Sequence, residues 1–354
     1  MNKKLIALAV AGACVAPAAM AQTANPVTLY GQVNVMLESV EAKGGPSSAT
    51  AVSRRTRIED QSSRLGVRGT EDLGGGLKAF FQLETAFRPD SNNTTFAARN
   101  SAVGLQGGFG SVLIGRWDMP FKSAAIAIDP YGDIMISGIT GVLSDRGNFD
   151  RRDQNVLQYW SPTWGGVAFR FAATANENKS ATSNPRDMGA SVTYTGGPVY
   201  AFFTWEQHKD NNTGNALQPG TAGTPSYKED GYAGGGAVTF GPVKVGAQYQ
   251  EFKKTARTKQ KAMMLNGTYT IGNNQLIAQY MEAKDGHANG AAAFKCDSWS
   301  VAYKYNFSRR TSFVGSYVKV TNNDAANCNF GSNALTITAG QDPQGAYVGF
   351  LHNF

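Results

Sequence analysis

An alternation of apolar and polar side chains, which begins near residue 27 and continues to the C-terminus, constrains this chain more than any other feature. Val33, Val35 and Leu37 share one parity, and the polar residues Gln32 and Asn34 share the other. Successive side chains of a β-strand point to opposite faces, so this pattern predicts strands with one apolar and one polar face. The pattern recurs in segments of about ten residues, which predicts an all-β fold.

The connections between these segments are alternately short and long. Short turns occupy residues 71–76, 161–166, 196–198, 241–242, 272–274 and 308–310. Long connections occupy residues 41–62, 176–187, 208–229, 284–295 and 321–345. This arrangement is typical of an outer-membrane barrel. A soluble β-sandwich also alternates and stays open as the alternative, but the polar faces favour the barrel because they carry amides and charges that need water.

The chain lacks an apolar segment that could cross a membrane as a helix, once the N-terminus is set aside. Such a helix needs roughly 20 consecutive apolar residues, so any membrane crossing has to be made by strands. About sixteen strands can be counted, and an even number places both termini at the same rim. A barrel of this size is too wide for side chains to fill and encloses an aqueous channel. We therefore predict a sixteen-stranded antiparallel transmembrane β-barrel.

Residues 1–21 have the features of a secretory signal peptide. Two lysines precede an apolar stretch, and residues 19–21 (Ala-Met-Ala) form a cleavage box. Cleavage would leave residues 22–354 as a single barrel domain and would lower the formal net charge from +7 to +5, because two lysines are lost. A lipoprotein signal at Cys14 is the alternative.

The stretch from Gly115 to Arg152 does not follow the alternation. It shows neither a period of 2 nor a sustained period of 3.6, although strand patterns precede and follow it. Loops of this length without secondary structure are uncommon and are usually functional. Ile126, Ile128 and Ile136 are among its many aliphatic residues, which an exposed loop would not need. We therefore expect this stretch to pack against the inside of the barrel.

Six segments of the chain resemble the trimeric general porins of Gram-negative bacteria, most closely the β-proteobacterial branch. They are VTLYG (27–31), SRLGVRGTEDLGGGLKA (63–79), AVGLQGGFG with GR (102–110 and 115–116), YWSPTWGG (159–166), FSRRT (307–311) and VGFLHNF (348–354). The resemblance implies a homotrimer and a third extracellular loop that bends into the channel, where residues 115–152 are placed. It also implies that Phe354, at the end of an apolar alternation, is a signal for the barrel assembly machinery.

The porin resemblance places a basic cluster at the channel constriction on Arg64, Arg99 and Arg152. Parity agrees for Arg64 and Arg152, which alternate with apolar neighbours. Strict alternation would put Arg99 on the lipid side, so its place in the lumen requires a bulge or a rim position near Asn100. For each arginine the alternative is a rim residue whose long side chain reaches along the surface to water.

The opposing negative charges are expected from Glu84 on the wall and from Asp129 and Asp133 in the inserted stretch. Arginines on one wall repel one another, which is tolerable only where water lies between them. Positive charge on one side and negative charge on the other would create a field across a narrow aqueous slot. Charges at a constriction bias which ions enter, and with a net charge of +5 we predict a modest preference for anions.

The function expected from these features is passive diffusion of ions and small hydrophilic solutes across the outer membrane. An enzyme is not expected, because His208 and His287 fall at loops and His352 has the lipid-side parity, which leaves no base for a nucleophile. The expected partners are outer-membrane lipid, lipopolysaccharide and the assembly machinery, with no cofactor, metal or nucleic acid. A surface adhesin or a channel for one specific solute stays as the alternative.

Cys296 and Cys328 lie at the start of one strand and in the long connection after the next strand. Both are expected on the extracellular side of an oxidising compartment, which favours a disulfide between them. Sequence does not determine the distance between the two residues, so a pair of free thiols is the alternative.

Overall fold

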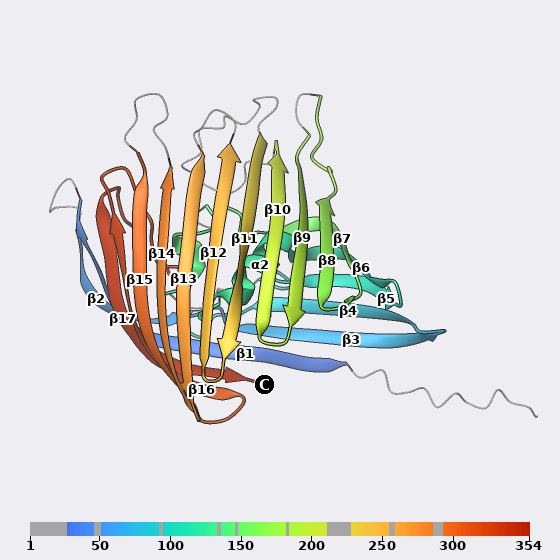
Figure 1. Ribbon diagram of the computed structural model, residues 1–354, viewed down its shortest axis with the longest axis horizontal. Coiled ribbons are helices and arrows are strands. Elements are labelled where there is room, and N and C mark those ends of the chain that lie inside the picture. The colour runs from blue at the N-terminus through green and yellow to red at the C-terminus, as the bar shows by residue number, and fades with distance from the viewer. Residues whose placement is uncertain are drawn as a thin grey trace, which may run out of the picture.

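The computed structural model describes residues 27–45, 51–91, 95–132, 136–145, 148–181, 184–210, 228–254, 259–285 and 293–354. The predicted signal peptide and Asp133 lie outside this part of the chain. The described residues form one antiparallel sheet of 17 strand segments, which Figure 1 shows with the chain coloured from blue to red. Three short helical segments lie between the sixth and seventh strands.

The strand segments follow the predicted order along the chain. The first six are β1 (Thr28–Gly44), β2 (Val52–Asp60), β3 (Arg64–Gly74), β4 (Leu77–Ala86), β5 (Ser101–Gly107) and β6 (Gly110–Asp118). The next six are β7 (Arg152–Trp160), β8 (Val167–Thr174), β9 (Arg186–Gly196), β10 (Val199–Lys209), β11 (Lys228–Phe240) and β12 (Val243–Lys254). The last five are β13 (Gln260–Ile271), β14 (Asn274–Asp285), β15 (Lys295–Asn306), β16 (Thr311–Asn322) and β17 (Gln341–Asn353).

The sheet closes into a barrel because its last strand pairs with its first. β17 and β1 are antiparallel neighbours from Gln32↔Asn353 to Gly44↔Gln341. β2 and β3 pair with successive stretches of β1 and together fill one position of the barrel. The 17 segments therefore make a closed barrel of sixteen antiparallel strands, which confirms the predicted fold.

β2 corrects the prediction that residues 41–62 are a connection. This segment, VSRRTRIED, carries charged side chains on both faces and so lacks the apolar alternation that marks the other strands. It pairs with the C-terminal half of β1, between Val35↔Asp60 and Ala42↔Val52. We infer that this strand lies beyond the apolar belt, where water rather than lipid covers its outer face.

The orientation of the side chains agrees with the predicted parity. Leu29, Leu265 and Phe350 are 62%, 56% and 58% exposed, because they project from the outer surface of the barrel. Gln158 and Gln279 are buried on the inner surface. An apolar outer surface of this kind suits contact with the lipid of a bilayer, whereas contact with water would favour polar side chains.

Residues 119–151, here called the inserted loop, fold into the barrel, as the sequence predicts. Figure 1 shows its first helix, α2 (Pro120–Ala125), behind the ring of strands, and η2 (Ile126–Ile128) and η3 (Ile139–Gly141) follow along the chain. Pro120 is the first residue of α2, where the fixed φ of proline favours a helix and its missing N–H costs nothing. β6 continues to Asp118, so the loop begins four residues later than expected.

The apolar side of the inserted loop packs against the inner surface of the barrel. Phe121 and Phe149 contact Phe252 of β12, with ring centroids 5.9 and 4.8 Å apart. Ile128 and Ile139 are also buried. Each such side chain contributes about 1.5–3 kcal/mol when it leaves water. Burial of these residues holds the loop inside the barrel.

The inner surface of β10–β16, here called the anchoring wall, binds the inserted loop through polar groups as well. The side-chain amide of Asn266 donates to the carbonyl of Ile128 at 2.9 Å, and that of Gln248 donates to the carbonyl of Ala125 at 3.3 Å. We expected such residues to face water. On this side of the barrel they are instead buried beneath the loop, where they satisfy backbone groups that would otherwise lack partners.

Candidate functional site

A buried ionic cluster fixes the C-terminal part of the inserted loop to the anchoring wall. Lys254 of β12 forms ion pairs with Asp145 of the loop and, at 3.7 Å, with Glu229 of β11. Asn148 of the loop donates to Glu229 at 2.6 Å. His208 lies between Glu206 and Glu229 and stacks on the loop at Phe149, with ring centroids 4.3 Å apart. Within the described residues no group of His, Cys, Asp and Glu is placed to hold a metal ion.

His208 corrects the prediction that it falls in a loop. It is the penultimate residue of β10 and is fully buried between the strand and the inserted loop. No hydroxyl or thiol nucleophile is bonded to its ring within the described part of the barrel, since both ring nitrogens face carboxylates. The histidine therefore anchors the loop. His287 lies outside the described residues.

A second loop, residues 323–340 between β16 and β17, also folds inward and meets the inserted loop. The amide of Gly331 donates to the carbonyl of Ile136 at 2.9 Å, and the hydroxyl of Thr140 donates to the carbonyl of Gly331 at 2.5 Å. A disulfide joins Cys328 of this loop to Cys296 of β15, with their Cα atoms 6.3 Å apart. The disulfide thus ties the second loop to the barrel wall.

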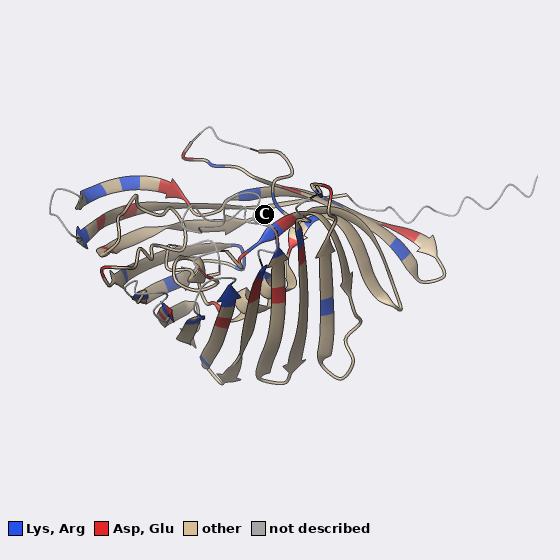
Figure 2. Cartoon of the chain, turned by 90° about the horizontal axis from the view of Figure 1, so that it is seen from above, with Lys and Arg blue, Asp and Glu red and all other residues tan. Residues whose placement is uncertain are grey.

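A cavity of about 490 Å³ lies between α2 and the inner surface of β3–β6, here called the arginine wall. Figure 2, seen from above, shows basic and acidic segments next to each other near the C-terminus of the chain, which is also part of the lining. The charged residues that line this cavity are Arg64, Glu84, Arg99, Asp118 and Lys122. The structure therefore brings together Arg64, Arg99 and Glu84 of the predicted constriction.

Arg99 faces the lumen, which resolves the conflict between parity and resemblance. β5 begins at Ser101, so Arg99 precedes the strand and is not bound by its alternation. Its Nε donates to Oε1 of Glu84 at 2.6 Å, and its Nη1 donates to the hydroxyl of Ser62 at 3.0 Å. The rim position near Asn100 is therefore the one that the structure adopts.

Arg152 does not line this cavity but pairs with Asp118, which does. Its Nη2 lies 3.0 Å from Oδ1 of Asp118, and its Nε donates to the side-chain oxygen of Asn100 at 2.7 Å. A neighbouring cavity of about 450 Å³ is lined by Arg152 together with Arg116 and Arg151. Arg64 and Arg99 thus line the first cavity and Arg152 lines the second, where Asp153, Glu177 and Asp187 accompany the arginines.

Arg116 and Arg151 are lumen residues that the sequence analysis missed. Arg116 follows Gly115, where a φ of 149° and a shift in register interrupt the alternation of β6. Arg151 precedes β7 and pairs with Asp153 at 3.0 Å and Asp187 at 3.2 Å. Burial alone would lower the pKa of Arg151, but these two carboxylates outweigh it and raise the pKa above its ordinary value. The Gly-Arg pair at 115–116 is the one signal that could have indicated Arg116.

Asp129 corrects the predicted acidic side of the constriction. Its two carboxylate oxygens accept the backbone N–H groups of Tyr131 at 3.0 Å and Ile139 at 3.1 Å. Asp129 is buried, because it caps a turn of the inserted loop, and does not face the slot. Burial in the same loop raises the pKa of Tyr131 to about 12. Asp133, the other candidate in the loop, lies outside the described residues.

Glu84 lies beside the arginines rather than opposite them. Besides Arg99, its carboxylate accepts the hydroxyl of Tyr30 at 3.0 Å. The Tyr30 ring occupies the space over Gly66, where an added Cβ would lie 2.2 Å from a ring atom. On the α2 side Lys122 pairs with Asp150 at 2.8 Å and Asp118 at 3.7 Å. The opposite charges of the site are therefore interleaved on both sides of the cavity.

Comparisons with known proteins agree with this architecture. The family described as Gram-negative porin matches residues 7–325. The chain belongs to the Gram-negative porin family. This porin is 32% identical to outer membrane porin protein 32 of Delftia acidovorans, over 100% of both chains. It is 28% identical to the major outer membrane protein P.IB of Neisseria gonorrhoeae, over 88% of this chain and 91% of that protein.

Solved structures show the same fold. The anion-selective porin from Comamonas acidovorans superposes with a TM-score of 0.79 at 28% identity, covering 93% of this porin and 100% of that chain. OmpT of Vibrio cholerae in its trimer form superposes with a TM-score of 0.66 at 18% identity, covering 94% and 100%. This porin therefore resides in the outer membrane and forms a water-filled channel for passive diffusion of ions and small hydrophilic solutes. The family and the homologues indicate a channel rather than an enzyme.

Proposed function

We propose that this porin prefers anions modestly and that the arginine wall sets the preference. The observation that carries the proposal is the charge of the cavity lining, in which three basic side chains outnumber two acidic ones. Within the described residues Arg64 has no carboxylate partner and binds only the side-chain oxygen of Gln32, at 3.3 Å. Its charge is therefore available to ions in the lumen. The name of the anion-selective porin from Comamonas acidovorans supports the same preference.

The preference is modest because the other arginines are partly neutralised. Arg99 pairs with Glu84, and Arg152 pairs with Asp118. Two unit charges 4 Å apart interact by only about 1 kcal/mol in bulk water, so one uncompensated arginine in an aqueous slot changes ion entry by a few-fold. Interleaved charges also orient the water in the slot, and a solute that displaces this water without replacing its hydrogen bonds passes poorly. Small polar solutes and ions pass.

Reversal potentials in a salt gradient across a planar bilayer test this proposal. The variant Arg64→Gln with Arg152→Gln removes two charges from the site. Its matched control, Arg309→Gln with Arg310→Gln, removes two charges from an exposed short turn. We expect the first variant to move selectivity toward cations by a few-fold and the control to keep the wild-type value.

Two results would contradict the assignment of the arginine wall. One is an unchanged reversal potential in the Arg64 and Arg152 variant. The other is an equal change in the Arg309 and Arg310 control, which would show that overall charge and not the constriction sets the preference. Conductance of both variants should remain measurable, since neither change removes a contact of the inserted loop with the anchoring wall.

We further propose that the assembled form is a homotrimer. The trimer form named for OmpT of Vibrio cholerae supports this state, as does the resemblance of the sequence to trimeric porins. Cross-linking of the purified protein in detergent, followed by mass determination, should give three subunits. Cross-linked products of no more than two subunits would contradict the proposed homotrimer.

The biogenesis of the porin follows from its two termini. We propose cleavage after residue 21, release of residues 22–354 as the barrel, and recognition of Phe354 by the assembly machinery. Phe354 projects outward and its backbone exchanges two hydrogen bonds of 3.1 Å with Gly31, at the point where the barrel closes. Phe354→Ala should lower the amount of folded porin in the outer membrane, with Phe307→Ala as an outward control of the same type. Lipopolysaccharide is the proposed lipid partner.

A further inference from the structure

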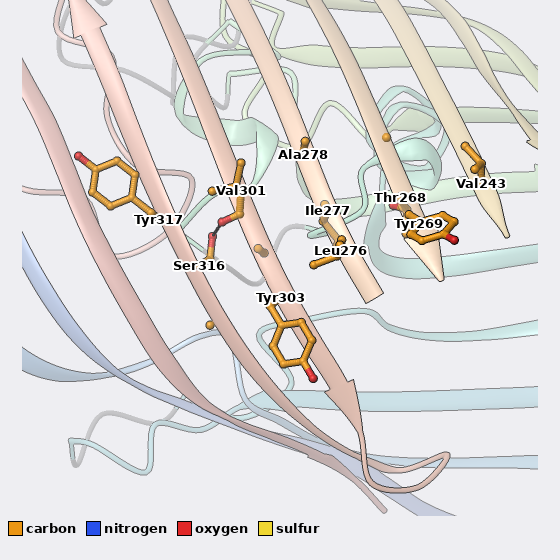
Figure 3. A pocket seen from close by; sticks show the side chains of 13 residues that line it. Val243, Thr268, Tyr269, Leu276, Ile277, Ala278, Val301, Tyr303, Ser316 and Tyr317 are labelled. Carbon is orange, nitrogen blue, oxygen red and sulfur yellow. Dashed lines mark hydrogen bonds between the residues drawn. The ribbon is translucent and has the colours of Figure 1, made fainter. Parts of the chain in front are cut away.

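Two cavities of the barrel differ in the chemistry of their linings. Figure 3 shows a groove on the outer surface of β12–β16, where Leu276, Val301 and Tyr303 contribute to a mostly apolar lining. The other, here called the β7–β9 cavity, has a volume of about 450 Å³ and lies where the inserted loop enters β7 and the long connection after β8 begins. Sites for small molecules have volumes of about 300–1,000 Å³. The β7–β9 cavity has this size and offers charged groups to a dissolved solute.

The charged residues that line the β7–β9 cavity are equal in number and opposite in sign. The basic ones are Arg116, Arg151 and Arg152, and the acidic ones are Asp153, Glu177 and Asp187. The cavity on the arginine wall, by contrast, has three basic and two acidic residues. A balanced lining does not favour a simple anion over a simple cation. It favours a solute that carries one charge of each sign.

Two of the three arginines are held by carboxylates of the protein. Arg151 pairs with Asp153 at 3.0 Å and with Asp187 at 3.2 Å. Arg152 pairs at 3.0 Å with Asp118, which belongs to the lining of the other cavity. These ion pairs fix the positions of the side chains that surround the β7–β9 cavity.

Two buried polar atoms of this lining lack hydrogen-bond partners among the described residues. One is a donor, the Nε of Arg116, and the other is an acceptor, the Oδ2 of Asp153. Asp153 uses its other oxygen, Oδ1, to accept from Arg151. A buried donor or acceptor without a partner is costly, because it has given up its contact with water. The cavity therefore presents one cationic donor and one anionic acceptor, and a solute of two charges would satisfy both.

Side-chain amides occupy further positions of the same lining. They belong to Asn148, Gln154, Asn155 and Asn178. Each side-chain amide can both donate and accept hydrogen bonds. A peptide bond carries the same two kinds of group, so these amides suit a solute with a peptide bond between its charged ends.

We propose that the β7–β9 cavity binds a short zwitterionic peptide, with its carboxylate on Arg116, its ammonium on Asp153 and its peptide bond among the amides. Charge-assisted hydrogen bonds from arginine to carboxylate are among the strongest in proteins. The long connections mark the extracellular side, so the peptide would be held beside the inserted loop on its way into the channel. This inference goes beyond the proposed anion preference, because it concerns a separate cavity and a solute without net charge.

Isothermal titration calorimetry of the full porin in detergent tests the proposal with three probes. They are dialanine, its N-acetyl derivative, which lacks the cation, and its C-terminal amide, which lacks the anion. Wild-type porin should bind dialanine about ten-fold more tightly than either derivative, because each derivative loses one charge-assisted hydrogen bond. Equal affinities for the three probes, or no saturable binding of dialanine, would overturn the proposal. Tightest binding of the N-acetyl derivative, the one probe with net negative charge, would also overturn it and would show a general anion site.

Two variants assign the ends of the peptide. Arg116→Met should bind dialanine about ten-fold more weakly and the amide as the wild type does, because the amide has no carboxylate to lose. Asp153→Asn should weaken dialanine in the same way and leave the N-acetyl derivative unchanged. The controls are Arg186→Met, at an exposed arginine beside the cavity but outside its lining, and Asp72→Asn, at an exposed short turn. An equal loss in the controls would overturn the assignment, since overall charge would then explain it.

The unfolding midpoint separates binding from a structural role of Arg116. Arg116→Met removes a buried donor that lacks a partner, so its midpoint should be no lower than that of Arg186→Met. A lower midpoint together with weaker dialanine binding would assign Arg116 to stability and overturn its role in binding.

Reversal potentials keep this proposal separate from the proposed selectivity. The order of the three probes is measured on wild-type porin. An unchanged reversal potential in the Arg64 and Arg152 variant would leave that order intact. Equal affinities for the three probes would in turn leave the salt-gradient result unaffected.

Discussion

The anchoring wall and the arginine wall are built from strands with the same polar inward parity, but they do opposite things with it. On the anchoring wall Asn266 and Lys254 are buried and bind the inserted loop. On the arginine wall Arg64 and Arg99 line a cavity. The two walls differ in whether the inserted loop covers them. α2 and the residues after it lie against the anchoring wall and leave a cavity between α2 and the arginine wall. Inward-facing polar side chains therefore bind the inserted loop on the wall that the loop covers, and they contact solutes on the wall that it leaves uncovered.

This comparison predicts that the two walls respond differently to loss of one charge. The largest effect is expected for Lys254→Met, which removes the ammonium that pairs with the buried carboxylates of Asp145 and Glu229. Removal of one partner of a buried ion pair costs about 3–5 kcal/mol. We expect a lower midpoint of thermal unfolding and a noisier single-channel current, because the inserted loop is no longer fixed at this end. Calorimetry and planar-bilayer recordings measure the two.

The neighbouring lysine provides the control for this variant. Lys253 is on the outer surface, 48% exposed, and its ammonium lies 4.9 Å from the centroid of the Tyr232 ring. Lys253→Met should leave both the midpoint and the current close to wild type. Wild-type behaviour of Lys254→Met would show that the ionic cluster does not hold the loop.

A smaller effect on the same wall is expected for Asn266→Leu. Leucine keeps the size of the side chain but leaves the carbonyl of Ile128 without its donor, which costs about 1–3 kcal/mol. The unfolding midpoint should fall by less than in Lys254→Met, and the mean conductance should remain unchanged. Gln275→Leu, which removes an amide at an exposed position, is the control. An equal fall of the unfolding midpoint in both variants would show that an amide beneath the inserted loop contributes no more to stability than an amide outside it.

Sequence predicted the barrel and the place of the inserted loop because both depend on local patterns. Alternation marks a strand wherever one face meets lipid, and its interruption marks the loop. Sequence did not predict which polar residues would be covered, since the parity of Asn266 and Arg64 is the same. Asp129 was assigned to the slot for this reason: a carboxylate that caps backbone N–H groups and one that faces water look alike in a sequence.

Positions next to interruptions of the pattern were equally hard to predict. Arg99 lies just before β5 and Arg116 lies within the register shift of β6, so parity fails for both. β2 lacks an apolar face altogether. The sequence therefore predicts the fold where contact with lipid requires every second side chain of a strand to be apolar. It does not predict the site, because the site lies at the ends of strands and beside a loop that covers part of the wall.

On the arginine wall the two partners of one ion pair should change selectivity in opposite directions. Arg99→Gln removes the excess positive charge of the cavity lining, and Glu84→Gln increases it. We expect the anion preference to fall in the first variant and to rise in the second, each by a few-fold in permeability ratio. Glu229→Gln, on the anchoring wall, should change stability without changing the reversal potential. A shift of the same sign in both arginine-wall variants would contradict the electrostatic account.

The smallest expected effect concerns salt, and it separates the two walls without a mutation. The Debye length falls from about 10 Å at 0.1 M salt to about 3 Å at 1 M, so charges that contact water in the lumen are screened at high salt. The anion preference measured with wild-type porin should therefore weaken as the KCl concentration rises over this range. The destabilisation caused by Lys254→Met should persist at both concentrations, because ions do not reach a cluster buried beneath the loop. Selectivity that stayed constant with salt would place its origin in the width of the channel rather than in the arginines.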